Sequence, residues 1–230
     1  ALALLAEPVF ADKKLDDAVA KAEEQLQKGR PDEALETLQK AVQGAPSVEG
    51  WIKLARFQER LGSMDEAMKS AVAAVGAATT PDAKAEALAA RSSLDLVAGT
   101  GKDALTNAQA AVAAQATPAA LAAEARAQVR TQDPHAALQS ADKAVAAGAA
   151  SALAHEAKGD ALLALGRKDE AVASYRKALE LDAKWSRARI GLAASLSAAG
   201  KHAEAVAEAK KVTAAEEKNA DAFATLALAM

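Results

Sequence analysis

The sequence predicts an all-α fold: a right-handed α-solenoid of about six stacked helix-turn-helix repeats and a partial seventh. Alanine accounts for 69 of the 230 residues and has the highest intrinsic helix propensity of any residue. Only six residues are aromatic, too few to fill a thick globular core. A third observation, a short motif that returns along the whole chain, indicates repeated units rather than one compact domain.

The motif is a glycine followed five residues later by alanine and six residues later by an aliphatic residue. The pairs that follow Gly29, Gly62, Gly99, Gly166 and Gly200 are Ala34-Leu35, Ala67-Met68, Ala104-Leu105, Ala171-Val172 and Ala205-Val206. Gln132 replaces the glycine ahead of Ala137-Leu138, which gives alanine spacings of 33, 37, 33, 34 and 34. Small residues also recur seven residues before each glycine. Such phased small residues predict helices that approach closely and bury their apolar faces by stacking.

Each unit is therefore expected to hold two helices joined by a turn at the glycine. Acidic residues such as Asp32-Glu33 and Asp169-Glu170 follow the turn, where unpaired backbone N–H groups at a helix start favour negative charge. Five of the six prolines lie either in the first turn of a second helix or between units. They are Pro31 and Pro134 in the first position, and Pro46, Pro81 and Pro118 in the second.

These residues resemble the tetratricopeptide repeat family, whose unit has about 34 residues in two antiparallel helices. The best copy spans 152–185 and keeps Gly159, Leu162, Gly166, Ala171, Tyr175, Ala178 and Leu181 in register. The sequence departs from the pattern at Gln132, at the long spacing across 79–85, and at His155 and Arg189, where the second unit has Trp51. The resemblance implies a superhelical domain over 12–230. Its units lie near 15–47, 48–84, 85–117, 118–151, 152–185 and 186–219, with a partial unit at 220–230.

The first eleven residues predict export. Ala1–Ala6 is apolar, and Val9 and Ala11 are small residues spaced as a signal-peptide cleavage site requires. We therefore expect residues 1–11 to be a signal-peptide remnant or an unstructured arm, and the protein to be periplasmic or extracellular.

The sequence offers no constellation for catalysis, so the protein is expected not to be an enzyme. The chain has no cysteine, and His135, His155 and His202 fall in three different units, away from metal-ligand spacing. Gly99-Thr100-Gly101-Lys102 lacks the first glycine and the final Ser/Thr of a phosphate loop. We expect no catalytic residue, no cofactor and no metal site.

Charge and hydropathy argue against nucleic acid and membrane partners. The net charge is −3, and basic residues are not clustered beside aromatic residues as phosphate binding requires. No uncharged apolar run after the N-terminus is long enough to span a bilayer. The expected partner is a protein or peptide.

The resemblance implies that residues ten, six and two positions before each turn face a concave groove. The candidate groove residues are Arg56, Arg60, Arg126, Arg130, Ile52, Glu156 and Asp160. Arginine pairs four residues apart share a helix face and are suited to a carboxylate or an acidic peptide. The alternative is that these arginines form salt bridges, with Glu59 and Glu124 close in sequence.

The chain ends within the first helix of the expected seventh unit. Phe223, Leu226 and Leu228 are candidates for end-to-end contact, since an uncapped apolar solenoid end favours association into a homo-oligomer. The leading interpretation is a non-catalytic scaffold or adaptor that binds a peptide or helix in its groove, in the bacterial envelope. Two alternatives stay open: a self-assembling structural protein, and the repeat portion of a longer enzyme or outer-membrane protein.

Overall fold

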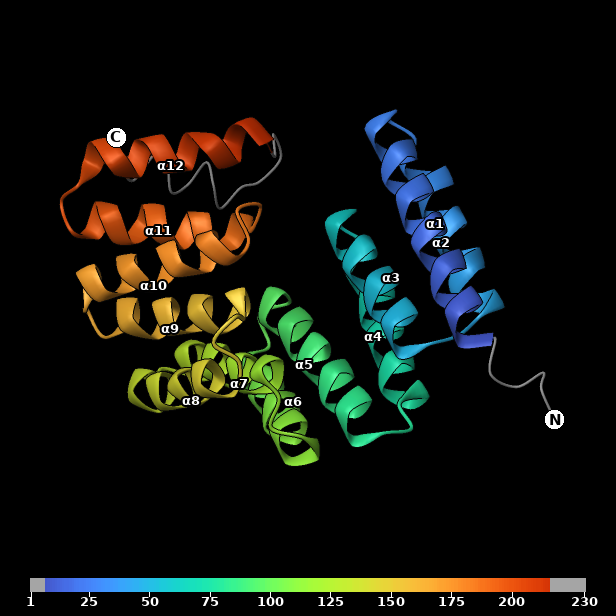
Figure 1. Cartoon of the computed structure of the whole chain (residues 1–230), viewed down its shortest axis with the longest axis horizontal. Coiled ribbons are helices and arrows are strands. Elements are labelled where there is room, and N and C mark those ends of the chain that lie inside the picture. The colour runs from blue at the N-terminus through green and yellow to red at the C-terminus, as the bar shows by residue number, and fades with distance from the viewer. Residues whose placement is uncertain (1–6, 216–230) are drawn as a thin grey trace.

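The computed structural model describes residues 7–215, and within that range it has twelve α-helices and no strand. The helices form six antiparallel pairs stacked side by side (Figure 1), so the predicted all-α solenoid is confirmed. The pairs are α1 (Glu7–Gln27) with α2 (Pro31–Gly44), α3 (Val48–Arg60) with α4 (Met64–Ala77), α5 (Pro81–Val97) with α6 (Gly101–Ala114), α7 (Pro118–Arg130) with α8 (Pro134–Ala147), α9 (Ala152–Ala164) with α10 (Lys168–Leu181), and α11 (Ser186–Ala198) with α12 (His202–Ala215).

The turn inside each pair needs a left-handed backbone conformation. The five phased glycines have φ between 71° and 83°, a region that glycine enters without steric cost. Gln132 holds the same conformation, with φ of 64°, and is the one non-glycine with positive φ among the described residues. The glycine column of the sequence is therefore the turn column of the structure, and Gln132 adopts the turn geometry with a side chain that disfavours it.

The alanine columns lie where paired helices cross. Ala34, Ala67, Ala104, Ala137, Ala171 and Ala205 all have an exposed fraction of 0%. The small residues seven positions before each turn are buried as well, as predicted. Small side chains at both faces of the crossing let the two backbones approach, and the leucine, valine and aromatic side chains fill the space beside them.

Three of the pairs share a buried or half-buried polar contact at equivalent positions, which was not predicted from the sequence. Thr37 donates to Gln25 at 2.9 Å, Ser70 donates to Gln58 at 2.7 Å, and Asn107 donates to Asp95 at 2.7 Å. In each pair the two residues lie four positions before and eight positions after the turn. The contacts fix the register between the two helices, because a polar group at a buried crossing must find its partner.

The third unit begins earlier than the expected residue 85. Helix α5 starts at Pro81 behind the N-cap Thr80, whose side chain accepts a hydrogen bond from the Ala83 backbone. The additional residues form one more turn of helix, which accounts for the spacing of 37 between Ala67 and Ala104. At the N-terminus, α1 begins at Glu7, and the assignment of residues 1–11 as a leader or arm stays a prediction.

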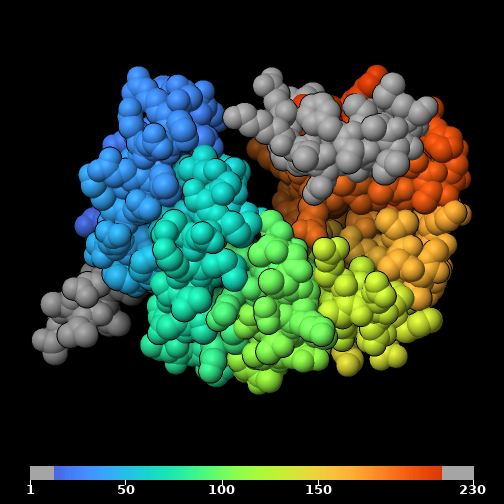
Figure 2. All heavy atoms as spheres, turned by 180° about the vertical axis from the view of Figure 1, so that it is seen from behind, coloured from blue at the N-terminus to red at the C-terminus, as the bar shows by residue number. Residues whose placement is uncertain are grey.

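The stack bends into an open arc, with α1–α2 and α11–α12 at its two ends and α5–α8 at the bend (Figure 1). The first helices of neighbouring units pack on one another from α3 to α11, whereas the second helices spread apart. In a curved stack, the helices on the inside lie closer to one another than the helices on the outside. The first helices of the units therefore form the inner wall. The space-filling view from behind shows the hollow between the N-terminal and C-terminal units (Figure 2).

Replacing Gln132 by glycine should stabilise the protein by about 1 kcal/mol, because glycine relieves the left-handed strain at this turn. Urea unfolding followed by circular dichroism measures the difference. The reverse change, Gly166→Ala, imposes the same strain on the equivalent turn and should destabilise by a similar amount. A Gln132→Gly protein no more stable than wild type would contradict this account of the turn.

Gly191→Ala should destabilise the protein by about 1–3 kcal/mol, because a Cβ at that position overlaps the buried ring of Tyr175 and the core cannot expand freely. The matched control is Gly76→Ala in α4, where a Cβ meets nothing within 4 Å. That change should stabilise slightly, since alanine is the better helix former. Equal melting temperatures for the two variants would be inconsistent with close packing of Gly191 on Tyr175.

Candidate functional site

The inner wall carries a compact group of charged and aromatic side chains, here called the inner-wall cluster: Arg126 of α7, Glu156 and Asp160 of α9, and Trp185 and Arg187 at the start of α11. Arg126 and Glu156 are 7% and 0% exposed, so the cluster has a buried floor. Three successive units contribute to it. Packing of first helix on first helix along the wall brings these units together.

Glu156 is the centre of the cluster. Trp185 Nε1 donates to its Oε2 at 2.6 Å, and Arg187 Nε lies 2.7 Å from its Oε1. Arg126 Nε lies 3.9 Å from the same Oε1, which accepts no well-aligned hydrogen bond within the described residues. Burial and the neighbouring Asp160 raise the pKa of Glu156, although Arg126, Arg187 and the indole oppose that shift.

Arg126 makes fewer hydrogen bonds than a buried guanidinium usually makes. Its Nη1 reaches Ser93 Oγ on α5 at 3.5 Å, and its Nε has no hydrogen-bond partner among the described residues. Burial and the nearby Arg187 lower the pKa of Arg126, while Glu156 acts in the opposite direction. Because a guanidinium stays charged at any physiological pH, Arg126 is a buried cation on the inner wall. Its Nε–H is a donor without an acceptor among the described residues.

Asp160 is tied to the packing between units. The Tyr175 hydroxyl of α10 donates to Asp160 Oδ1 at 2.5 Å. The Tyr175 ring packs against Gly159 and Gly191, which clear the space for it in α9 and α11. Burial raises the pKa of Tyr175 well above its ordinary value, with Asp160 adding to the shift, so the phenol remains a donor at neutral pH.

Glu59 of α3 faces the cluster from the N-terminal side of the arc. Burial raises the pKa of Glu59, and the charges of Arg56, Arg187 and Arg126 oppose the shift. Arg187 belongs to the sixth unit and Glu59 to the second, so the bend of the arc brings the two ends of the inner wall within electrostatic reach. Charged side chains of the second, fourth and sixth units therefore influence one another across the inner wall.

The arginines predicted to act in pairs separate in the structure. Arg60 Nη2 contacts Glu23 of α1 at 2.7 and 2.8 Å and lies over the Phe57 ring at 5.1 Å, so it links the first two units. Arg130 is exposed and packs beside Gly101 at the α5–α6 turn. Arg126 alone of these three enters the inner-wall cluster, and Arg56 is exposed on α3 beside Glu59.

The remaining predicted residues have varied surroundings. Ile52 is 4% exposed and packs in the core with Ala74 and Ala87, so it presents little surface to a ligand. Glu156 and Asp160 lie in the cluster. Phe223, Leu226 and Leu228 lie outside the described residues. Arg187 and Glu59 were not predicted from the sequence, although a search at thirteen and three positions before each turn would have found them.

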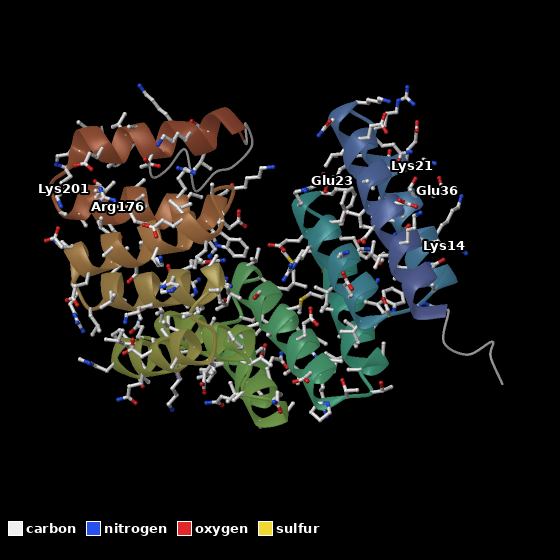
Figure 3. The ribbon with its side chains drawn as sticks, in the orientation of Figure 1. Lys14, Lys21, Glu23, Glu36, Arg176 and Lys201 are labelled. Carbon is white, nitrogen blue, oxygen red and sulfur yellow. The ribbon has the colours of Figure 1, made fainter. Side chains whose placement is uncertain are left out.

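The described residues contain no group of three His, Asp or Glu side chains arranged to hold a metal ion. Among the same residues, no helix is both long enough and apolar enough to cross a bilayer. Surface ion pairs are numerous elsewhere. Figure 3 shows Arg176 and Lys201 on the outer face of the C-terminal units, away from the inner wall.

A tetratricopeptide repeat family model matches residues 19–84 and 123–188, which is more than half of the chain. A second tetratricopeptide repeat model matches residues 186–210. No significant match was found among curated proteins.

Solved structures share the fold. A tetratricopeptide repeat protein from Parabacteroides merdae is 22% identical over 93% of this chain and 84% of its own, with a TM-score of 0.56. A thermophilic tetratricopeptide repeat protein from Thermus thermophilus is 23% identical over 79% of this chain and 98% of its own, with a TM-score of 0.58. The APC/C hetero-tetramer Cut9-Hcn1 matches with 17% identity and a TM-score of 0.66, over 95% of this chain and 43% of that one.

The raised pKa of Glu156 predicts a pH dependence of stability. A carboxyl with a raised folded-state pKa stabilises the fold most below its unfolded value, and this contribution is lost as pH rises through the folded pKa. Wild type should therefore gain stability relative to Glu156→Gln as pH falls from neutral towards the ordinary value of 4.5. Urea unfolding of both proteins across this range measures the difference.

Glu36→Gln is the control for that series. Lys40 lowers the pKa of the exposed Glu36, so any contribution from Glu36 is lost, rather than gained, as pH falls. A stability difference between wild type and Glu156→Gln that does not change with pH would show that Glu156 is not desolvated in the folded protein.

Proposed function

Because this chain belongs to the tetratricopeptide repeat family, we propose that it is a non-catalytic protein-interaction scaffold whose inner wall binds a peptide or helix of a partner protein. The proposal places binding in the hollow of the arc, between the N-terminal and C-terminal units. Helix-lined concave surfaces of this kind accommodate an extended peptide or an amphipathic helix by burying its side chains.

The observation that carries the proposal is the buried charge of the inner-wall cluster. At the position of Glu156, ten residues before the turn, the other five described units have Val19, Ile52, Ala89, Ala122 and Ile190. Apolar side chains therefore suffice for stacking, and a glutamate there adds a desolvation cost that Arg126, Trp185 and Arg187 must offset. Charges kept at such a cost in a concave surface are typical of a binding site.

The first helices that line the inner wall also carry partly exposed apolar side chains. Leu96, Val129 and Leu163 lie three residues before successive turns, and each is partly exposed. Val97, next to Leu96 at the end of α5, has an exposed fraction of 50%. A partner segment with aliphatic side chains flanking a charged group would match this arrangement, since burial supplies affinity and the charge supplies selectivity.

We also propose that the scaffold works outside the cytoplasm, in the bacterial envelope. The support is the apolar start and the small residues Val9 and Ala11 ahead of Asp12. N-terminal sequencing of protein isolated from its native cells tests this, with a mature start near Asp12 expected. A protein that keeps residues 1–11 and fractionates with the cytoplasm would contradict export.

Filling the inner wall should abolish partner capture. Ser93→Trp places a large ring on the wall at a partly exposed position of α5, where it takes the space of a bound segment. The matched control, Ala173→Trp, adds the same ring at an exposed position of the second helix α10. Affinity purification from native cells, with mass spectrometry of the proteins that follow the bait, provides the measurement.

The specific partner should follow wild type and Ala173→Trp and be missing with Ser93→Trp. Circular dichroism first establishes that both variants are folded. The same partner captured at the same level by folded Ser93→Trp would rule out binding in the hollow.

A further inference from the structure

The joint between the first and second units is built differently from the joints that follow it. From α3 onwards, neighbouring first helices pack on one another, whereas α1 is joined to α3 by two ion pairs, here called the bridging pairs. Lys53 Nζ lies 2.9 Å from Asp16 Oδ1. Arg60 Nη2 lies 2.7 Å from Oε2 of Glu23, which points from α1 towards α3 (Figure 3). Because long side chains make these contacts, the first joint does not depend on close approach of the two backbones.

The bridging pairs place both acids on α1 and both bases on α3. Within each helix the two residues are seven positions apart, which is about two turns, so they share one face. This combination of charges does not recur at the next four joints. The residues that take the places of Lys53 and Arg60 there are mostly alanine: Ala90 with Val97, Ala123 with Arg130, Ala157 with Ala164, and Gly191 with Ala198. Matched charges at both positions are therefore particular to the first joint.

The bridging pairs are suited to opening and closing. Their four side chains have exposed fractions from 30% to 70%, and exposed ion pairs are individually weak and screened by salt. Each base also has a partner on its own helix. Lys53 lies 2.7 Å from Glu49. Arg60 lies over the Phe57 ring at 5.1 Å. Separation of α1 from α3 therefore leaves neither base without a partner, which keeps the cost of opening small.

The chain connects the two units at the opposite end of α3 from Arg60. Residues 45–47 join α2 to α3, and a Cβ added to Gly50 would lie 3.4 Å from the Val42 side chain, so the two helices pack closely beside the connection. Arg60 is ten residues beyond Gly50, which is about 15 Å along the helix. A change of tilt at the connection therefore separates the helices most at Arg60 and disturbs the contact at Val42 least.

We propose that the first joint is a hinge: α1 and α2 tilt as one body about residues 45–47, and the bridging pairs hold the closed position. Since α1–α2 and α11–α12 stand at the two ends of the arc, this tilt changes the width of the hollow (Figure 1). Low ionic strength favours the closed position, and salt favours the open one. The hinge does not depend on the proposed function, because it controls access to the hollow whatever occupies it.

Distances between spin labels test the hinge. The chain has no cysteine, so two introduced cysteines are the sole labelling sites. Asp32→Cys on α2 with Ala173→Cys on α10 reports the distance across the first joint. Asp65→Cys, at the equivalent exposed position of α4, with Ala173→Cys reports a distance that excludes this joint. Double electron–electron resonance measures both distributions in about 10 mM and about 1 M NaCl, where the Debye length is roughly 30 Å and 3 Å.

The label pair across the first joint should give one narrow distance distribution at low salt and gain a population at longer distance at high salt. The closed-to-open ratio should fall about fivefold, the scale expected for two exposed ion pairs. The label pair that excludes the first joint should give the same distribution at both salt concentrations.

Glu23→Gln should produce the longer-distance population already at low salt. The matched control is Glu24→Gln, which removes the neighbouring exposed pair that Glu24 forms with Lys28 inside α1 and should change nothing. Exchanging the charges, with Glu23→Arg and Arg60→Glu in one protein, should restore the narrow distribution, which a purely local role for either residue does not predict. Circular dichroism establishes that each variant is folded.

Four results would overturn the hinge. A broad distribution in wild type at low salt, or one that salt does not change, would show that the bridging pairs do not hold a closed position. Wild-type behaviour of Glu23→Gln would exclude the pair with Arg60 as the restraint. Equal broadening for both label pairs would distribute the motion along the whole arc. Failure of the exchanged charges to restore the narrow distribution would show that Glu23 does not act through Arg60.

Discussion

The close approach of neighbouring helices is the constraint from which the rest of this structure follows. An alanine side chain reaches only a short distance, so two helices that meet through alanines gain van der Waals contact only when their backbones are near. Each crossing buries little apolar area, and stability must be summed over many similar crossings. The fully buried alanine column, from Ala34 to Ala205, shows this principle applied in every unit.

The same constraint decides where large side chains are admitted. Tyr175 fits between α9, α10 and α11 because Gly159 and Gly191 remove the side chains that would meet its ring. Once Tyr175 is seated, its hydroxyl fixes Asp160, and the chain that leaves α10 delivers Trp185 to Glu156. The charged inner wall therefore develops where the packing of the fifth and sixth units departs from alanine on alanine. In this region, hydrogen bonds such as Tyr175 to Asp160 and Trp185 to Glu156 join the units in addition to apolar packing.

The repeat phasing is local information, and the sequence therefore predicts it well: glycine turns, alanine crossings and the pairing of helices all depend on residues close in the chain. Gln132 is an instructive case, since the register alone assigned it to a turn that it adopts with φ of 64°. The inner wall was predicted less well. Four-residue spacing places Arg126 and Arg130 on one face of α7, but the curvature of the stack decides what each meets. Arg126 turns to Glu156 of the next unit, and Arg130 to Gly101 of the preceding one. Curvature accumulates over units, and no single motif encodes it.

Curvature also explains how a chain of nearly balanced charge comes to hold charged side chains away from water. Ion pairs on the outer face, such as Arg176 with Glu204, stay solvated and screened, so they contribute little to stability or to recognition. On the inner wall the arc removes water from Arg126 and Glu156, and each charge there must be matched by another. The bend that brings Glu59 towards Arg187 thus gathers ionic side chains of separate units into one partly desolvated group.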